Sequence, residues 1–523
     1  MHVGIDLGTT FCCMATVGDD QEVIVIPNSE GRLTTPSVIC FDGKYAYVGD
    51  SANARKLFHP SLIYEFVKRD MGKPVEAVGF EDPMDLTAQN EVRPFEIAGF
   101  RYGAAGLSAL ILRKLKQDAV RYFKKIAKLE KDADEKRVIL DAVITVPAYF
   151  GDKERQDTKL AGFAAGLNVQ KLINEPTAAA LTYGLLQKED ERIMVFDLGG
   201  GTLDVTLMGM ECGKPVVVAS DGANTLGGKD WDEVIQRYLV EQFFLQNGRD
   251  LPTTGEVAYE VQQKALEAKL ELSENTETTV HLAIEEGNLE VTLYRSAPKE
   301  DPLNRFDIGP DRPFYFDERS SDLLSRCRTI CSMALENARW TWGHVQEIVL
   351  AGGSCRMPMI IELLETMSGR KVRQNVVNYD HAIAIGAALH GAHQDRLQDV
   401  VSHCMGVRYR SGEGFYVEHL IRKNANLPTG GKQRFAAERN AILLVYEGES
   451  ERPEECNLRG RLELDNPAGS IEVALEMDTN GVVRALADYS PQGKQVLELR
   501  SELFNFSERA EPLQEKIRSV VMK

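Results

Sequence analysis

The sequence predicts two folded units, an α/β domain over most of the chain and an all-β sandwich after it. Three observations support this organisation. An apolar segment that ends in an acid and is followed by glycines and hydroxyls occurs twice, at the start of the chain and near residue 200. Apolar strand patterns alternate with alanine-rich helix patterns around both copies, which is typical of an α/β domain. From residue 406 to 500 the polarity has a period of two with recurrent turns, which favours a sandwich.

The stronger copy of the repeated segment is Val-Phe-Asp-Leu-Gly-Gly-Gly-Thr-Leu-Asp at residues 195–204. Its glycines leave backbone N–H groups uncovered, so the turn can wrap closely around phosphate oxygens. Asp197 and Asp204, at the two edges of the turn, offer the hard oxygen ligands that a hydrated Mg²⁺ needs. This segment therefore predicts a hairpin that binds phosphates.

The weaker copy is Val-Gly-Ile-Asp-Leu-Gly-Thr-Thr at residues 3–10. A glycine-rich turn in an ordinary β-hairpin explains most single Asp-Leu-Gly strings. Two copies nearly two hundred residues apart instead indicate an internal repeat, and two such hairpins that face each other would hold one nucleotide between them.

Composition narrows the class of protein. The chain of 523 residues is too long for one core, so we expect two or more domains. Its 43% apolar and 27% charged residues are ordinary for a globular protein. The net charge of −18 argues against a nucleic-acid partner, because phosphate binding over a broad surface needs an excess of Lys and Arg.

The lack of a recognisable targeting signal and the placement of the cysteines predict a cytoplasmic protein without a membrane partner. No basic and apolar leader precedes the first strand, and no apolar run approaches membrane-spanning length. The nine cysteines are scattered within apolar segments, as buried thiols would be. Cys327 and Cys331 lie one helical turn apart but lack a second pair or a nearby His, so helix packing explains them better than a metal site.

The elements of the first unit follow from apolar spacing. The spacing predicts a meander of strands over residues 1–49, a buried strand over 138–146, and helices over 61–72, 106–131, 156–166, 177–186 and 257–273. A glycine pair at 227–228 precedes a further helix, where free N–H groups at a helix start would meet phosphate. Residues 297–312, rich in Pro, Asp and Gly, predict a surface loop.

The doubled hairpin resembles the actin-like ATPase superfamily, whose nucleotide-binding domain is a duplicated ribonuclease-H-like fold. Three further strings narrow the resemblance: Val-Ile-Thr-Val-Pro-Ala-Tyr-Phe at 143–150, Ile-Asn-Glu-Pro-Thr-Ala-Ala-Ala at 173–180 and Gly-Gly-Ser-Cys-Arg-Met-Pro at 352–358. As a set they resemble the heat-shock seventy-kilodalton chaperones of the DnaK type. The β region resembles the same chaperones less closely, at residues 420–429 and 474–481.

The resemblance implies four parts of the chain. Residues 1–395 would form an actin-like ATPase domain, 396–404 an interdomain linker, 405–500 a β-sandwich that binds peptides, and 501–523 a short tail. The tail would stand in place of the family's long helical lid. From this we expect faster peptide exchange and a narrower range of clients than in relatives with a lid.

The resemblance also implies ATP and Mg²⁺ as cofactors and a set of site residues. Mg²⁺ would lie between Asp6 and Asp197. The residues with catalytic roles would be Lys68, Glu175, Asp197, Thr202 and Asp204. The nucleotide would contact Gly8, Thr9, Thr10, Phe11, Gly200, Gly201, Thr202, Gly228, Lys269, Ser273, Gly353, Ser354, Arg356 and Asp380. An exposed helix lysine and a first-turn glutamate are the ordinary alternatives for Lys68 and Glu175.

Some positions depart from the family's pattern. Leu266 and Leu270 stand where the family commonly has a Glu and an Arg that contact the nucleoside, so we expect weaker nucleotide affinity. Residues 397–404 keep only part of the leucine-rich character of the family's linker. The family's contacts with its J-domain co-chaperone and between its domains fall on Arg155, Lys171, Asn174 and Thr177, and the second of these is often Arg.

These observations predict an ATP-dependent chaperone that hydrolyses ATP, binds extended or unfolded polypeptides, and works with a J-domain co-chaperone and a nucleotide exchange factor. The alternative is a nucleotide-gated scaffold or regulator that binds one specific partner. A small-molecule kinase or a filament-forming ATPase would use the same doubled hairpin, but the β region argues against both. A P-loop enzyme is excluded because no Gly-x-x-x-x-Gly-Lys-Ser/Thr string occurs.

Overall fold

The computed structural model describes residues 1–522 except for 43–44, 57, 76–78, 81–92, 95, 98–99, 136, 185–190, 212–213, 253–254, 299–312, 375, 393–399, 412–413, 438–441, 464–468, 480, 482 and 489–505. The predicted surface loop at 297–312 lies outside the described residues apart from 297–298. The same holds for residues 396–399 of the predicted linker.

The first half of the N-terminal domain is built on a mixed sheet. Its strand order is β13 (Asn168–Asn174), β12 (Asp141–Val146), β1 (His2–Asp6), β2 (Phe11–Val17) and β3 (Val23–Val25), and β4 (Thr34–Pro36) also pairs with β2. β1 runs antiparallel to β2 and parallel to β12. Residues 7–10 form the turn that joins β1 to β2, so this turn follows Asp6 directly.

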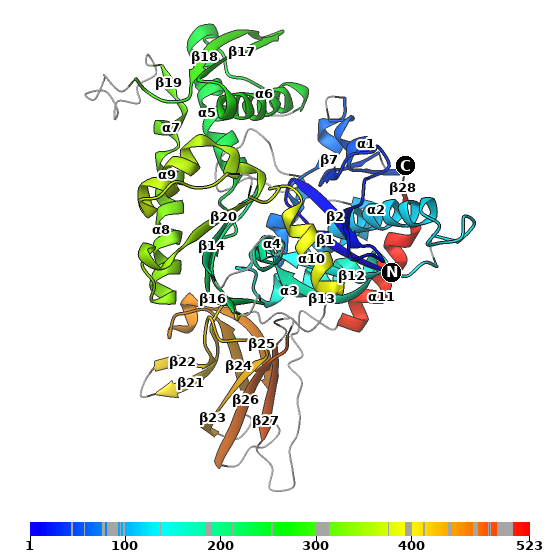
Figure 1. Cartoon of the computed structure of the whole chain (residues 1–523), viewed down its shortest axis with the longest axis vertical. Coiled ribbons are helices and arrows are strands. Elements are labelled where there is room, and N and C mark those ends of the chain that lie inside the picture. The colour runs from blue at the N-terminus through cyan, green and yellow to red at the C-terminus, as the bar shows by residue number, and fades with distance from the viewer. Residues whose placement is uncertain are drawn as a thin grey trace.

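The second half repeats this arrangement. Its sheet has the order β16 (Lys214–Ala223), β15 (Leu203–Glu211), β14 (Arg192–Leu198) and β20 (Glu347–Ala351). β14 runs antiparallel to β15 and parallel to β20, as β1 does to β2 and β12. The predicted duplicated α/β fold is thus confirmed (Figure 1).

Two alanine-rich helices lie between the sheets, α4 (Glu175–Gly184) and α10 (Ala382–Ala392) (Figure 1). Small residues let them approach very closely. A Cβ on Gly386 of α10 would lie 1.8 Å from the carbonyl oxygen of Ala178 in α4, and a Cβ on Gly4 of β1 would lie 2.0 Å from the nitrogen of Ala388. Only glycine fits at such contacts, so the pair of helices and the first sheet are packed backbone to backbone.

The remaining helices cover the outer faces. α2 (Ala104–Lys125) and α3 (Asp152–Ala164) pack on the first sheet, and α8 (Ser321–Ala338) and α9 (Pro358–Ser368) pack on the second. α5 (Gly228–Asn247) and α6 (Gly255–Glu274) pack against β17 (Glu277–Ile284) and β18 (Gly287–Tyr294) at the top of Figure 1. The short elements are α1 (Asp50–Asn53), β5 (Ile39–Phe41), β6 (Tyr45–Val48), β8 (Gly79–Phe80), β9 (Arg93–Pro94), β10 (Glu96–Ile97), β11 (Phe100–Arg101), β19 (Phe314–Tyr315) and α7 (Phe316–Arg319).

The helix predicted over residues 61–72 is wrong. The structure has the 3₁₀ turn η1 (Pro60–Leu62), strand β7 (Ile63–Tyr64) and the 3₁₀ turn η2 (Val67–Asp70) in its place. β7 pairs with β5, and Phe66 has left-handed backbone angles with φ 57°. The strand pairing supplies hydrogen bonds that an isolated helix with this apolar spacing would have to supply itself, so tertiary context overrides the local pattern.

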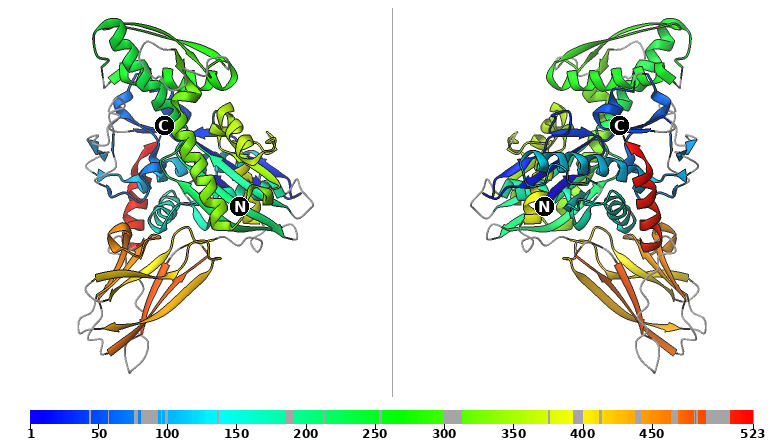
Figure 2. Two further views of the ribbon diagram at one scale, coloured as in Figure 1. Left: turned by 90° about the vertical axis from the view of Figure 1, so that its left-hand side faces the viewer. Right: turned by 90° about the vertical axis from the view of Figure 1, so that its right-hand side faces the viewer.

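The C-terminal unit is the predicted β-sandwich. One sheet has the order β22 (Gly414–Ile421), β21 (Met405–Ser411), β24 (Ile442–Glu447) and β25 (Asn457–Glu463), and the other has β23 (Thr429–Ala437), β26 (Gly469–Met477) and β27 (Val483–Asp488). All neighbouring strands are antiparallel, and alternate residues of both sheets fill a shared core. Figure 2 shows the sandwich below the N-terminal domain in both side views.

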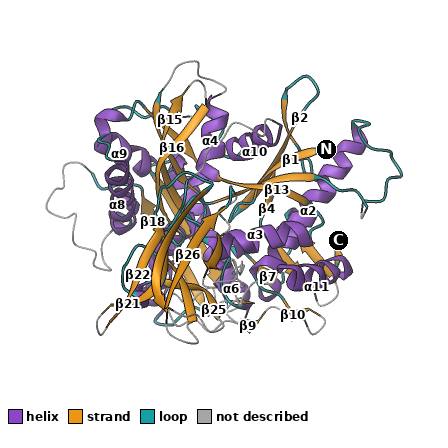
Figure 3. Cartoon of the chain, turned by 90° about the horizontal axis from the view of Figure 1, so that it is seen from below, coloured by secondary structure: helices purple, strands orange, loops and turns teal. Residues whose placement is uncertain are grey.

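The last described segment returns to the N-terminal domain. α11 (Phe506–Ser519) lies beside α3 (Figure 3), and β28 (Val521–Met522) pairs in parallel with β6. Ile517 and Val520 are buried in the core of the first half, and the Arg113 guanidinium donates to the Val520 carbonyl at 2.9 Å. This part of the predicted short tail is therefore held by packing and strand pairing.

No helix in the described part of the chain combines the length and apolar character needed to cross a membrane.

Candidate functional site

The turn after β1 lies opposite the turn after β14. A Cβ on Gly200 would lie 1.9 Å from the Thr10 hydroxyl oxygen, and a Cβ on Gly201 would lie 2.5 Å from the Thr9 methyl carbon. The approach is possible only because the second turn is made of glycine. The structure thus brings together the two hairpins that the sequence predicted to face each other.

A buried salt bridge lies beside these turns, between the Lys68 ammonium and the Glu175 carboxylate. Their side chains are only 4% and 6% exposed. Lys68 is in η2, and Glu175 is the first residue of α4, directly after β13. Neither residue is a solvated surface charge, which removes the ordinary alternative for Lys68.

Three aspartates share this environment. Burial, reinforced by Glu175, raises the pKa of Asp6 to about 7 and the pKa of Asp204 to about 7. Burial, Glu175 and the two other aspartates raise the pKa of Asp197 well above its usual value. Lys68 opposes each of these shifts. Each carboxylate therefore lies close enough to Glu175 and Lys68 for its pKa to be shifted by them.

A backbone amide fixes the position of Asp204. The Tyr149 N–H donates to Asp204 Oδ1 at 3.0 Å, and Asp204 is directly opposite Asp197 in the β14–β15 ladder. Tyr149 belongs to the segment between β12 and α3. The second half's carboxylate is therefore held by a loop of the first half.

The start of α5 is bonded to the second hairpin. The Gly228 N–H donates to the Gly199 carbonyl at 3.0 Å, and the Lys229 N–H donates to the Gly200 carbonyl at 2.9 Å. Lys269 of α6 donates to the Gly228 carbonyl at 3.0 Å. The turn after β14 and the first turn of α5 are thus one rigid unit, as the predicted glycine pair requires.

The residues predicted to bind the nucleoside lie next to the second hairpin. Gly352 follows β20 with φ 77°, and the Ser354 hydroxyl donates to the Gly199 carbonyl at 2.9 Å. Arg356 and Asp380 form a two-bond ion pair at 2.8 and 3.0 Å. The guanidinium also lies 5.2 Å from the centre of the Tyr379 ring.

Two predicted contacts are less well placed. The Phe11 side chain is 53% exposed at the start of β2, so its backbone is the part that faces the turn. The Ser273 hydroxyl donates to the Lys269 carbonyl of its own helix at 3.0 Å. Leu270, one of the departures from the family, is 57% exposed.

Sequence reasoning missed Arg69, which joins the two halves of the N-terminal domain. Its Nε donates to the Gly201 carbonyl at 3.0 Å, and its Nη2 donates to Asp230 Oδ2 at 2.6 Å. Asp230 Oδ2 also accepts the Gly227 N–H at 2.7 Å. The only signal in the sequence is that Arg69 follows Lys68 and Asp230 follows the glycine pair.

The linker contacts the N-terminal domain near this site. Val400 packs in the core cluster that includes α4 and β20, while Val401 packs in the sandwich core. The Arg155 guanidinium donates to the Asn174 side chain at 2.6 Å and to the Ser402 hydroxyl at 3.2 Å. Of the four residues predicted for interdomain and co-chaperone contacts, Arg155 therefore bonds the predicted linker directly, and Asn174 is bonded to Arg155.

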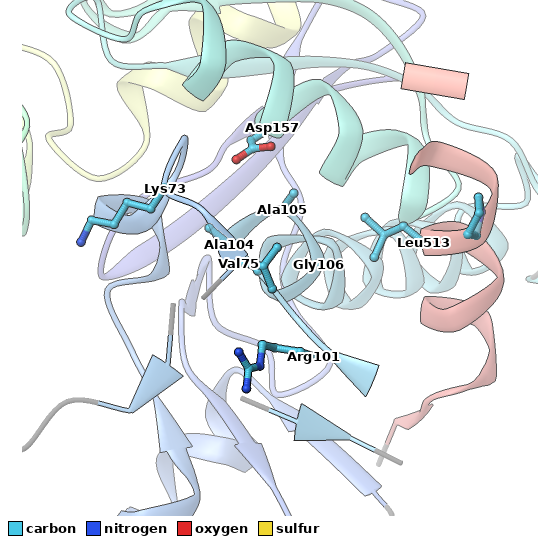
Figure 4. A pocket seen from close by; sticks show the side chains of 10 residues that line it. Lys73, Val75, Arg101, Ala104, Ala105, Gly106, Asp157 and Leu513 are labelled. Carbon is cyan, nitrogen blue, oxygen red and sulfur yellow. The ribbon is translucent and has the colours of Figure 1, made fainter. Parts of the chain in front are cut away.

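A cavity of about 260 Å³ lies away from the hairpins, between the start of α2 and α11 (Figure 4). Arg101, Gly103, Ala105 and Asp157 line it from the N-terminal domain, and Leu513 lines it from α11. It contains none of the predicted nucleotide-binding residues. The C-terminal helix therefore completes a surface feature that is separate from the hairpin site.

Comparison with known proteins agrees with this geometry. The profile of the family described as Hsp70 protein matches residues 2–509. The chaperone protein DnaK of Prochlorococcus marinus (strain MIT 9515) is 34% identical over 515 residues, which cover 94% of this chain and 77% of that protein. The chain therefore belongs to the Hsp70 family of ATP-dependent chaperones, and it is an ATPase.

Proposed function

We propose that the two hairpins hold the phosphates of ATP between them. The contact of Gly200 and Gly201 with Thr10 and Thr9 carries this proposal, because it places uncovered backbone N–H groups and two hydroxyls around one volume. Gly8 and Thr202 would complete the contacts. Transfer of a phosphoryl group to water depends mainly on positioning and charge neutralisation, which such a preformed cradle supplies.

Mg²⁺ would be held by Asp6 and Asp197. Asp197 Oδ2 is buried and has no hydrogen-bond partner among the described residues, which is the state expected of a carboxylate oxygen that faces a cation. Burial and the neighbouring carboxylates raise the pKa values of both residues, and a bound cation would oppose this because it favours the ionised forms. When bound, the ion would neutralise phosphate charge, and its water shell would contact the carboxylates.

Lys68, Glu175 and Asp204 would surround the terminal phosphate. The Lys68 ammonium would contact phosphate oxygens, and Glu175, which pairs with it, would orient the attacking water. The Tyr149 N–H keeps Asp204 oriented toward the same volume. All three groups are prearranged, so little reorganisation is needed when ATP binds.

The adenosine would lie between α6 and the segment after β20. Lys269 and Ser273 would contact it from α6, and Gly353, Ser354 and Arg356 from the other side. Asp380 would act mainly through Arg356, because the two side chains form a bidentate pair. Gly228 would stay close to the phosphates, since Lys269 and Ser354 enclose it.

For the domains we propose the predicted division at 1–395, 396–404, 405–500 and 501–523. Val400 and Val401, which pack in different cores, support a boundary within the linker. The sandwich would bind extended polypeptide segments. The protein's chaperone family implies polypeptide clients and co-chaperones in general, and we propose a J-domain protein and a nucleotide exchange factor among them.

A J-domain would approach Arg155, Lys171, Asn174 and Thr177. Arg155 supports this because it contacts both Asn174 and Ser402, so a partner bound there would act on the linker. We also propose a cytoplasmic location, because the eight cysteines in the described part of the chain are all free thiols, as in a reducing compartment.

The test is ATP turnover with and without a peptide library, for the wild type and for Lys68→Ala. We expect the variant to lose turnover by at least about a hundredfold, because it removes charge neutralisation at the phosphate. Peptides should stimulate the wild type. Lys131→Ala, which changes an exposed lysine, is the matched control and should behave as wild type. Full turnover in Lys68→Ala would contradict the assignment.

A further inference from the structure

His403 lies in the linker at the surface where the sandwich meets the N-terminal domain. Its Nδ1 lies 3.0 Å from Glu449 Oε1 of the sandwich, and its Nε2 lies 3.1 Å from the carbonyl oxygen of Tyr149 in the N-terminal domain. The imidazole also packs edge to face on the Tyr149 ring, with centroids 4.5 Å apart. The His403 side chain is only 14% exposed.

Both hydrogen-bond partners of His403 are acceptors. A carbonyl oxygen can only accept, and an ionised carboxylate can only accept. A neutral imidazole has one donor nitrogen and one acceptor nitrogen, so it would satisfy one partner and place two acceptors against each other at the second. The imidazolium donates from both nitrogens and satisfies both.

We propose that His403 is a proton-binding site that strengthens the docking of the sandwich on the N-terminal domain. Docking brings the Tyr149 carbonyl to an imidazole that already has Glu449 from its own domain. The second acceptor therefore exists only in the docked arrangement. A proton on His403 is consequently bound more tightly in that arrangement, and by linkage it favours docking.

Glu449 and Glu447, the carboxylates that favour a charge on His403, belong to the sandwich, so the Tyr149 carbonyl is the acceptor that docking adds. Glu447 of β24 lies near and is paired with Arg459, and Lys423 lies 5.6 Å from the centre of the Tyr149 ring and pairs with Asp221 at 3.2 Å. Burial opposes a charge on His403, but Glu449, Glu447 and the Tyr149 carbonyl outweigh it and raise its pKa.

A second titratable group at this interface, the Asp152 carboxyl, also favours docking when it is protonated, but it titrates at lower pH. The Asp152 N–H donates to Glu447 at 3.3 Å, and burial raises the pKa of the Asp152 carboxyl to about 6. The two contributions can be separated, because substitution of His403 removes only one of them.

The sign of the pH dependence follows from the raised pKa of His403. Its contribution to docking is fully present below the pKa of His403 in the undocked arrangement, where the imidazole faces Glu449 without the Tyr149 carbonyl, and is lost as the pH rises through the higher pKa of the docked state. Docking should therefore weaken between pH 6 and 8, by about tenfold in the docking constant for each unit of difference between the two pKa values.

The docking surface is also connected to the hairpin site. Tyr149 accepts a hydrogen bond from His403 through its carbonyl and donates one to Asp204 through its N–H. The proton site therefore lies one residue from a proposed catalytic carboxylate. The inference about docking does not depend on whether docking controls hydrolysis.

The test uses the full chain with one dye at Lys131 and one at Glu454, both exposed and on different domains, attached through unnatural amino acids. With the nucleotide state held constant, energy transfer between the two dyes should show that the docked fraction of the wild type falls from pH 6 to pH 8. His403→Gln can still donate to one partner but cannot carry a proton, so its pH dependence should be flatter over this range. His419→Gln, in the same sandwich, is the matched control and should retain the wild-type profile.

A second measurement reads the site directly. NMR titration of the full chain with labelled histidine, assigned by comparison with His403→Gln, should give His403 a pKa above 6.5 that falls toward that value in Glu449→Gln. An unchanged docking profile in His403→Gln, or a His403 pKa at or below 6.5 in the docked protein, would overturn the proposal.

Discussion

Arg69 and Asp230, 161 positions apart in the chain, form an ion pair at 2.6 Å that joins the two halves of the N-terminal domain. Arg69 also bonds the Gly201 carbonyl, and Asp230 bonds the Gly227 N–H. The two residues therefore fasten the second hairpin and the start of α5 to the first half.

We expect Arg69→Gln to release nucleotide about tenfold faster, because it removes a charge-assisted contact of about 1.5–3 kcal/mol that holds the halves together. Stopped-flow dissociation of a fluorescent ADP measures the rate. Arg69→Lys should be intermediate, since one ammonium cannot make both contacts. Arg137→Gln, an exposed arginine, serves as the control, and equal rates in all four proteins would refute the expectation.

Gly227→Ala should weaken ATP binding by at least about tenfold. Its added Cβ would lie 2.5 Å from the nitrogen of Gly201, so the hairpin and the start of α5 would have to separate. Calorimetric titration with ATP measures the affinity. The matched control is Gly209→Ala in β15, where a Cβ meets nothing within 4 Å, and its affinity should equal that of the wild type. Similar losses in both variants would show that the close contact is not the cause.

Asp197→Asn should stabilise the nucleotide-free protein while it abolishes ATP turnover. The substitution removes one of several buried carboxylates that repel one another, so we expect a gain of about 1 kcal/mol and, for a domain of this size, a rise of about 1 °C in Tm. Differential scanning calorimetry without nucleotide gives Tm. Asp132→Asn, at an exposed position, should shift neither quantity. A lower Tm in Asp197→Asn would show that the carboxylate is stabilising as it stands.

Ile517→Ala should loosen the C-terminal segment from the first half. Truncation of a buried Ile side chain costs about 2–5 kcal/mol, and Ile517 is fully buried between α11 and the N-terminal core. We expect amide hydrogen exchange in α11 and β28 to rise by about tenfold or more. Glu515→Ala, on the exposed face of the same helix, is the control. Protection as strong as in the wild type would mean that other contacts hold the segment.

Local patterns predicted the two kinds of domain well. The repeated acid-and-glycine segment predicted two facing hairpins, and the structure places their turns in contact. The change to a period of two predicted the sandwich, in which alternate residues of β24, β26 and β27 lie in the core. These features are readable because turns, strand periodicity and glycine contacts are encoded by neighbouring residues.

Residues 61–72 show the limit of this reading. Their apolar spacing suits a helix, but the pairing of β7 with β5 and the left-handed Phe66 place Lys68 in a short 3₁₀ turn. That turn directs Lys68 toward Glu175, 107 positions away. The partner of a buried charge cannot be read from its own segment.

Local spacing alone was enough to predict a duplicated nucleotide-binding domain, a β-sandwich and, within the first domain, two segments of acids and glycines. Three relationships could be seen only in the folded molecule: Arg69 joins the two halves, His403 lies between two acceptors and α11 returns to the first half. Those relationships join groups far apart in the chain, and packing of the whole molecule alone brings them within hydrogen-bond distance.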